Sequence, residues 1–195
     1  MKTIFLTLSA LLMVSLTTLN ESPKQKLQNL SGTYSDVQAV DWGHGTFGKR
    51  TFTFEKGYWT LQFVLSFDPA QTQKIFTFRT EGNFEVLKPS EAVEGAYEAV
   101  FYEDQKRVTL HMDNPEIIEG FGFTTCGLEV DIEKDISNVG CSFWKSVAQC
   151  AEDHDLMKLD NKGHLYFGQR PEDNDMCTAD RRPTSLTVPV EKINL

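Results

Sequence analysis

Apolar and polar residues alternate along the middle of the chain, from Arg50 to Val86. Every second residue from Trp59 to Phe67 is apolar, and polar residues such as Thr60 and Gln62 stand between them. An alternation with a period of two is typical of a β-strand that buries one face. The pattern recurs on both sides of this run, and the Lys56-Gly57 pair supplies a turn. The stretch therefore predicts three consecutive antiparallel strands that share an apolar face.

The apolar face is rich in aromatic rings. Its members, with one residue from a later strand, are Phe52, Phe54, Leu61, Phe63, Leu65, Phe76, Phe78, Phe84 and Phe101. A sheet with so many rings on one face must cover that face or curl around it. We predict that these nine residues line the interior of a barrel and contact a ligand there. In the alternative, they only fill a core, and each burial stabilises the fold by about 1.5–3 kcal/mol.

Further alternating runs follow at short intervals. Strands are predicted over Val93–Tyr102 and Arg107–Met112, with later strands over 156–159, 164–168 and 186–190. The sequence also predicts a bent strand over Ile117–Thr125, a short helix over Phe143–Ala148 and a flexible lead-in over Lys24–Asn29.

Together these runs predict an all-β chain of about 8–10 antiparallel strands. A meander of eight or more strands usually closes, and a barrel of about eight strands holds either side chains or one small ligand. We therefore predict a lipocalin-like β-barrel, closed or half-open. A two-sheet sandwich is the alternative.

The first residues are typical of an export signal. Lys2 precedes an apolar run from Ile4 to Leu16, which is short for a membrane span. We predict a signal peptide over residues 1–20 and a single β-barrel domain over residues 21–195. The protein would then be secreted, to an extracellular or periplasmic location. An uncleaved membrane anchor is the alternative.

All four cysteines lie in the second half of the chain, at Cys126, Cys141, Cys150 and Cys177. An even number of cysteines in an exported chain predicts two disulfides, for which three connectivities exist. We favour Cys126–Cys141 and Cys150–Cys177, because the second pair would close the open end of a hairpin centred near Asn161-Lys162-Gly163. The spacings lack the C-x2-C pattern of a zinc site.

The net charge and the absence of catalytic motifs restrict the classes of function further. The net charge is −9, or −10 without Lys2 of the predicted leader, which argues against nucleic acid as a partner. The sequence has no G-x-S-x-G motif and no phosphate-binding loop. We expect neither catalysis nor a cofactor, and the scattered histidines predict no metal site. These histidines are His44, His111, His154 and His164.

Several short motifs occur in one order along the chain. They are Leu30-Ser31-Gly32-Thr33-Tyr34, Arg50-Thr51-Phe52-Thr53-Phe54, Gly82-Asn83-Phe84, Cys126-Gly127, Val139-Gly140-Cys141, Cys150, Asp155-Leu156-Met157-Lys158-Leu159, Leu165-Tyr166-Phe167-Gly168, Met176-Cys177-Thr178 and Arg181-Arg182-Pro183-Thr184. In this order they resemble the domain of the adenomatosis polyposis coli down-regulated family, over nearly the whole chain after the leader. The C-terminal motifs are the more specific ones.

The resemblance implies a secreted, lipocalin-like, partly open barrel with an apolar pocket for an acyl chain, and a lipid-modified protein among its partners. The chain departs from the animal members, which antagonise Wnt signalling, because it carries one copy of the domain and lacks the extra N-terminal cysteines. Lipid binding is therefore the property that we expect to carry over.

We expect a secreted, monomeric, non-enzymatic binding protein that holds a hydrophobic small molecule or an acyl chain in its aromatic interior. The alternative is a filled-core module that recognises a protein or a carbohydrate through the loop from Trp42 to Gly48. Arg181 or Arg182 is expected to stack on Tyr34, or else to pair with a ligand carboxylate.

Overall fold

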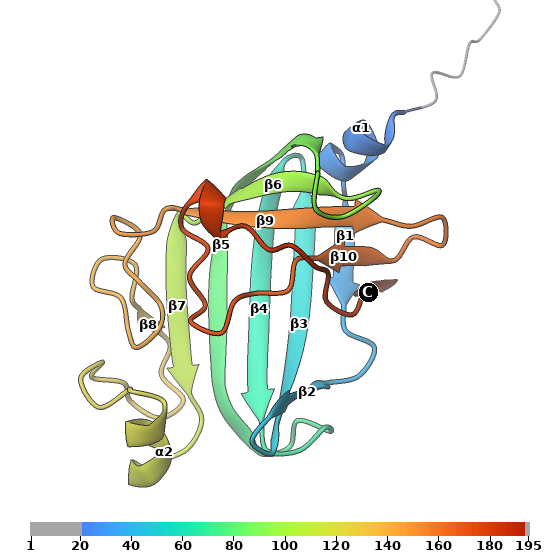
Figure 1. Cartoon of the computed structure of the whole chain (residues 1–195). Helices are drawn as coiled ribbons and strands as arrows, with labels where there is room; N and C mark the ends of the chain where they lie inside the picture. Colours follow the sequence, from blue (N-terminus) through green and yellow to red (C-terminus); the bar gives the residue numbers. More distant parts are fainter. Residues whose placement is uncertain (1–20, 194–195) are drawn as a thin grey trace, which may run out of the picture.

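A computed structural model describes residues 21–193 of the chain. The signal peptide predicted over residues 1–20 lies outside this range. The elements are α1 (Pro23–Gln28), β1 (Gly32–Ser35), β2 (Val40–Gly43), β3 (Thr46–Glu55), β4 (Tyr58–Ser66), β5 (Lys74–Pro89), β6 (Tyr97–Tyr102), β7 (Gln105–Leu110), α2 (Pro115–Gly120), β8 (Lys134–Asp135), β9 (Glu152–Leu159), β10 (Leu165–Phe167), a 3-10 turn η1 (Ala179–Arg181) and β11 (Glu191–Ile193) (Figure 1).

The strands form one antiparallel sheet that curls into a nearly closed eight-strand barrel. Its strand order is β10-β9-β6-β5-β4-β3-β1-β11, and β2, β7 and β8 add to this path. The ring closes through the C-terminal segment, since β11 pairs with β1 while the preceding Val190 pairs with Leu165 of β10. In Figure 1, β6 and β9 run across the upper halves of β3, β4 and β5, and the short β10 lies beside the end of β9, over β1. The predicted fold class is confirmed.

The long strand β5 holds the two halves of the barrel together. Its first part pairs with β7 in register Phe76 to Leu110, and its last part pairs with β6 in register Phe84 to Phe101. Gly82 stands where β5 changes partner. A Cβ atom at Gly82 would overlap the carbonyl oxygen of Tyr102, so the strands can diverge there only around a glycine.

A buried ion pair ties the closing segment to the barrel wall. The Arg50 guanidinium in β3 lies 2.6 Å from Asp36, and the side chains are only 12% and 2% exposed. The same guanidinium donates hydrogen bonds to Thr187 Oγ1 (2.8 Å) and to the carbonyl oxygen of Val188 (2.9 Å). Because a bidentate, buried arginine is held rigidly, this group fixes the segment before β11 against β3.

The last predicted strand is displaced, because residues 186–190 form only isolated bridges at Leu186 and Val190 and β11 follows them. Three other local predictions are wrong about the kind of element, each for an identifiable reason. The predicted lead-in forms α1, because Ser22 and Gln25 make a reciprocal capping box and Leu27 is buried. The predicted bent strand contains α2, which Asn114 caps by accepting hydrogen bonds from the next backbone N–H groups. The region 143–148 is not helical, because Cys141 and Trp144 exchange backbone hydrogen bonds in a tight turn instead.

The apolar interior divides into two clusters. The first aromatic cluster contains Leu27, Leu30, Tyr34, Phe52, Phe54, Trp59, Phe84, Val86, Ala99, Phe101, Met157, Leu165, Phe167 and Val190. The second aromatic cluster contains Leu65, Ile75, Phe76, Phe78, Val108, Leu110, Phe123, Ile136, Cys141 and Trp144.

Two disulfides, Cys126–Cys141 and Cys150–Cys177, have the predicted pairing. The first of them belongs to the second aromatic cluster, against which Cys126 packs. Among residues 21–193, no helix is both long and apolar enough to cross a bilayer.

Candidate ligand-binding site

The nine residues predicted to line a ligand site are divided between the two clusters. Phe52, Phe54, Phe84 and Phe101 belong to the first cluster, and Leu61 packs against it. Leu65, Phe76 and Phe78 belong to the second cluster, and Phe63 packs against it. Seven of the nine are buried, whereas Leu61 and Phe63 are only half-buried. These two residues are thus the part of the predicted set that a ligand could reach without a change of packing.

Leu61 and Phe63 occupy the middle of β4, where one cluster gives way to the other. In the sheet register, Leu61 stands between Phe52 of β3 and Thr80 of β5. Phe63 stands between Arg50 and Phe78 in the next row. Since alternate residues share a face, Leu61 and Phe63 present their side chains on the same inner surface.

Trp42 covers Phe63 from the neighbouring hairpin. The ring centroids of Trp42 and Phe63 are 4.7 Å apart with an interplanar angle of 50°, and Trp42 is 49% exposed. The indole lies over Gly48 of β3, where a Cβ atom would overlap both the Trp42 and the Phe63 rings. Gly48 is therefore required for this contact.

A β-bulge directs Trp42 to this position. Asp41 pairs with Phe47 and Gly43 pairs with Thr46, so Trp42 is the extra residue between the two pairs. Bulges bend a strand and re-aim a side chain, and they are frequent near functional sites.

The predicted loop from Trp42 to Gly48 is instead a hairpin, because Trp42 lies in β2 and Gly48 in β3, with His44-Gly45 at the turn. The two sequence-based hypotheses, an aromatic interior and a recognition segment at Trp42, meet in the contact between Trp42 and Phe63.

Two polar side chains lie beside this surface, Arg50 with its hydrogen bonds already made and Thr80 without a partner among the described residues. Arg50 neighbours Phe63, but Asp36, Thr187 and Val188 already engage its guanidinium. The Thr80 hydroxyl, beside Leu61, is buried and has no hydrogen-bond partner among residues 21–193. Sequence analysis did not single out Thr80, although the alternation that places Phe78 and Phe84 inside also places Thr80 inside.

The cation near Tyr34 is not the predicted one. Lys192 of β11 lies opposite Tyr34 in the sheet register, with its ammonium 5.8 Å from the ring centroid. Arg182 instead donates hydrogen bonds to the carbonyl oxygens of Ala99 and Asp155, and Arg181 pairs with Asp173. The arginine-stacking prediction is therefore wrong, because strand pairing brings the C-terminal lysine to Tyr34.

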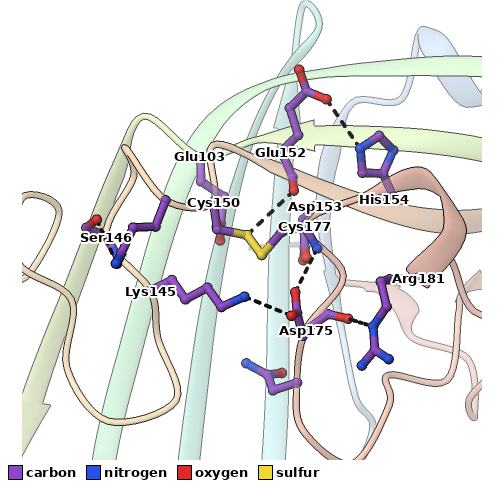
Figure 2. Close-up of a disulfide and its surroundings, with 12 residues drawn as sticks. Glu103, Lys145, Ser146, Cys150, Glu152, Asp153, His154, Asp175, Cys177 and Arg181 are labelled. Carbon is purple, nitrogen blue, oxygen red and sulfur yellow. Dashed lines mark hydrogen bonds and ion pairs between the residues drawn. A yellow bond between two sulfur atoms is a disulfide. The ribbon is translucent and has the colours of Figure 1, made fainter.

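The Cys150–Cys177 disulfide lies in a region rich in charged side chains (Figure 2). Beside it, Lys145 donates a hydrogen bond to the Asp175 carboxylate at 2.8 Å. Deeper in the structure, the Lys106 ammonium is 2.6 Å from the Glu103 carboxylate and also donates to the carbonyl oxygen of Cys150 at 3.1 Å. Burial raises the pKa of the Glu103 carboxyl, and the nearby Lys106 opposes this shift.

A second buried set of charges lies on the adjoining strand, β9. The Arg170 guanidinium pairs with Asp153 at 2.5 Å. Asp155 accepts hydrogen bonds from the backbone N–H groups of Leu156 (2.6 Å) and Gly168 (2.9 Å). Burial raises the pKa of Asp155 to about 7, and the charge of Asp153 acts in the same direction. These charged groups bind one another and backbone atoms, so we assign them a role in stabilising the fold.

The candidate site is therefore the surface formed by Trp42, Phe63 and Leu61, with the Thr80 hydroxyl beside it. Such a surface offers contact to apolar groups, whereas the Thr80 hydroxyl is buried beneath it and is not open to a ligand. Within the part of the chain that the structure describes, no group of three or more His, Cys, Asp or Glu side chains is placed to hold a metal ion. No protein-family model matches the sequence, and no curated protein matches it significantly.

Proposed function

We propose that this protein is a secreted, monomeric, non-enzymatic binding protein that holds an acyl chain, or a similar apolar ligand, against Trp42, Phe63 and Leu61. A nearly closed barrel with aromatic clusters is compatible with a binding protein, and two disulfides are consistent with an extracellular location. One observation gives the strongest support for an apolar ligand. Leu61 and Phe63 remain half-exposed on an inner face whose other predicted members are buried.

The energetics of such a complex are favourable. Burial of apolar surface contributes about 25 cal/mol per Å². An acyl chain of about fourteen methylenes could gain roughly 11 kcal/mol if fully transferred from water. The cost of association, about 4–15 kcal/mol, offsets much of this gain. At the lower end of this cost, the net gain of about 7 kcal/mol corresponds to a dissociation constant on the order of 10 µM. The resemblance to the adenomatosis polyposis coli down-regulated family supports the choice of an acyl chain.

A second candidate function follows from the packing of the clusters. Phe52 stacks on Phe167 with centroids 4.1 Å apart, and Phe78 stacks on Trp144 at 4.5 Å. Rings that already pack on one another favour a filled core. In that case, Trp42 would contact a protein or carbohydrate partner at the surface instead of covering a lipid.

Displacement of a fluorescent fatty acid from the purified, oxidised protein tests the proposal. We expect Phe63→Arg and Trp42→Ala each to weaken binding by tenfold or more, because both remove apolar contact from the site. Tyr58→Ala is the matched control, since this ring is 38% exposed on the other face of β4. Wild-type protein that binds no fatty acid, or variants that bind as tightly as wild type, would contradict the proposal.

A further inference from the structure

A surface hollow lies behind the candidate site, on the outer face of the same strands. We call it the outer groove, and its volume is about 690 Å³. Its floor consists of cross-strand neighbours on β3 and β4, and its walls are the loop after β1 and the loop between β4 and β5, together with Lys74 at the start of β5. The floor residues are Lys49, Thr51, Gln62 and Val64, and the wall residues are Val37, Gln38, Ala39, Pro69, Ala70, Gln71 and Lys74.

Hydrogen bonds hold both walls in place. The loop from Val37 to Ala39 follows Asp36, which is fixed by the buried ion pair with Arg50. The other loop is organised by the Asp68 carboxylate, which accepts hydrogen bonds from the backbone N–H groups of Thr72 (3.2 Å) and Gln73 (2.7 Å). Gln71 then donates from its side chain to the carbonyl oxygen of Val64 at 3.2 Å. The groove is thus shaped before a ligand arrives, which lowers the cost of binding.

The charge of the outer groove is opposite to that of the whole chain. The chain has 28 acidic and 19 basic residues, yet no carboxylate lines the groove. Lys49 and Lys74 are its charged members, and neither forms an ion pair with any residue between 21 and 193. Two unpaired ammonium groups in an acidic protein complement an anionic ligand.

The remaining polar groups suit a ligand that carries hydroxyls. The side chains of Gln38 and Gln62 each offer amide donors and an acceptor. The Thr51 hydroxyl is hydrogen-bonded to Ser35 at 2.9 Å and keeps the capacity to accept a further hydrogen bond. A peptide bound by strand addition would need free backbone groups at a strand edge. The floor strands offer none, because β3 is paired with β1, β2 and β4, and β4 is paired with β3 and β5. Recognition must therefore use side chains.

We propose that the outer groove binds an anionic oligosaccharide. Lys49 and Lys74 contact its acidic groups, and Thr51, Gln38 and Gln62 hydrogen-bond its hydroxyls. The volume lies within the range of about 300–1,000 Å³ that small-ligand sites occupy. This site is separate from the apolar one, because Gln62 and Phe63 are adjacent in β4 and point to opposite faces of the sheet.

Isothermal titration with an oligogalacturonate hexamer, a carboxylate-bearing probe, tests this site. We expect wild-type protein to bind the probe and not to bind cellohexaose, a neutral glucose hexamer. Lys49→Gln with Lys74→Gln should weaken binding at least tenfold. The matched control is Lys56→Gln with Lys162→Gln, which removes the same charge from two exposed turns and should change affinity less than twofold.

Three outcomes would overturn the assignment. They are no binding of the hexamer at millimolar concentration, an equal loss in the control double variant, and equal binding of a polyglutamate peptide. Thermal unfolding of both double variants checks that they fold. Fatty-acid displacement should be the same in all of these proteins, so failure of the outer groove and failure of the apolar site are distinguishable.

Discussion

The two aromatic clusters of the interior are built in different ways. The rings of the first cluster come mainly from alternate residues of strands, such as Phe52 and Phe54 of β3. The second cluster takes Phe76 and Phe78 from β5, but it takes Phe123 and Trp144 from segments outside the strands. Paired strands thus supply most of the first cluster, with Leu27 of α1 packed into it, while the second depends on irregular chain that a disulfide holds in place.

This difference has consequences for stability and for the site. A cluster enclosed by strands should persist when the disulfides are removed, whereas one enclosed by crosslinked loops should loosen. Leu61 and Phe63 lie at the boundary between the two clusters, where neither packing arrangement covers them completely. The candidate ligand site thus lies where the cluster enclosed by strands meets the cluster enclosed by crosslinked loops.

The largest effect is expected from Phe76→Ala in the second cluster. Phe76 lies edge-on to Phe121, Phe123 and Trp144, with centroids 5.2–5.6 Å apart, so its loss leaves a cavity between strand and loops. We expect the free energy of unfolding in urea to fall by about 4 kcal/mol. Phe143→Ala is the control, because that ring is 42% exposed, and it should cost less than about 1 kcal/mol. An equal loss of unfolding free energy in both variants would contradict the central packing role of Phe76 in the second cluster.

Removal of the Cys126–Cys141 disulfide should have the next largest effect. The cysteines are 15 residues apart, and a loop of this length is stabilised by about 3 kcal/mol when crosslinked. Replacement of both cysteines by serine should lower the free energy of unfolding by this amount. Hydrogen exchange should show faster exchange in the second cluster while β3 and β6 stay protected. An equal loss of protection in both clusters would contradict the claim that only the second cluster depends on this disulfide.

A smaller and opposite effect is expected from Asp155→Asn. Asp155 pairs in register with Ala99 of the first cluster, and its pKa is about 7 in the folded state against 3.8 ordinarily. Because folding raises the pKa of this carboxyl, the stability that protonated Asp155 contributes is fully present below about pH 4 and is lost as the pH rises toward 7. The full loss corresponds to roughly 4 kcal/mol at most. We expect the neutral amide to recover about 2 kcal/mol at pH 7.5.

Thermal and urea unfolding of wild type and Asp155→Asn across pH 4 to 8 provide the measurement. The difference in unfolding free energy should vanish near pH 4 and grow to a constant value above pH 7. A difference that does not change with pH would show that the Asp155 carboxyl has no raised pKa.

The sequence was most informative where local patterns decide structure. Alternation between Trp59 and Phe67 predicted β4 and its inner face, since each strand residue turns its side chain opposite to the last. Both disulfides were also predicted, because the Asn161-Lys162-Gly163 turn brings the flanks of Cys150 and Cys177 together. The helices were missed because each has only six residues, too few to show a helical period, and their signals are confined to the capping residues Ser22 and Asn114 and the prolines that follow.

The site itself depends on features that alternation does not encode. The position of Trp42 over Phe63 results from a bulge, and a bulge depends on the register between two strands. The bond from Arg50 to Thr187 joins residues 137 apart in the chain, so no local window contains it. Likewise, the exposure of Leu61 follows from where the two clusters end.

The most direct test of the proposed site uses the indole N–H signals of the three tryptophans, Trp42, Trp59 and Trp144. Trp59 and Trp144 are buried, at 3% and 7% exposure, and Trp59 donates to the carbonyl oxygen of Tyr102 at 3.1 Å. In a titration of nitrogen-15-labelled protein with palmitate, we predict that the Trp42 indole signal moves the most. A titration that leaves Trp42 unmoved would contradict the account, whether no indole responds or only Trp59 does.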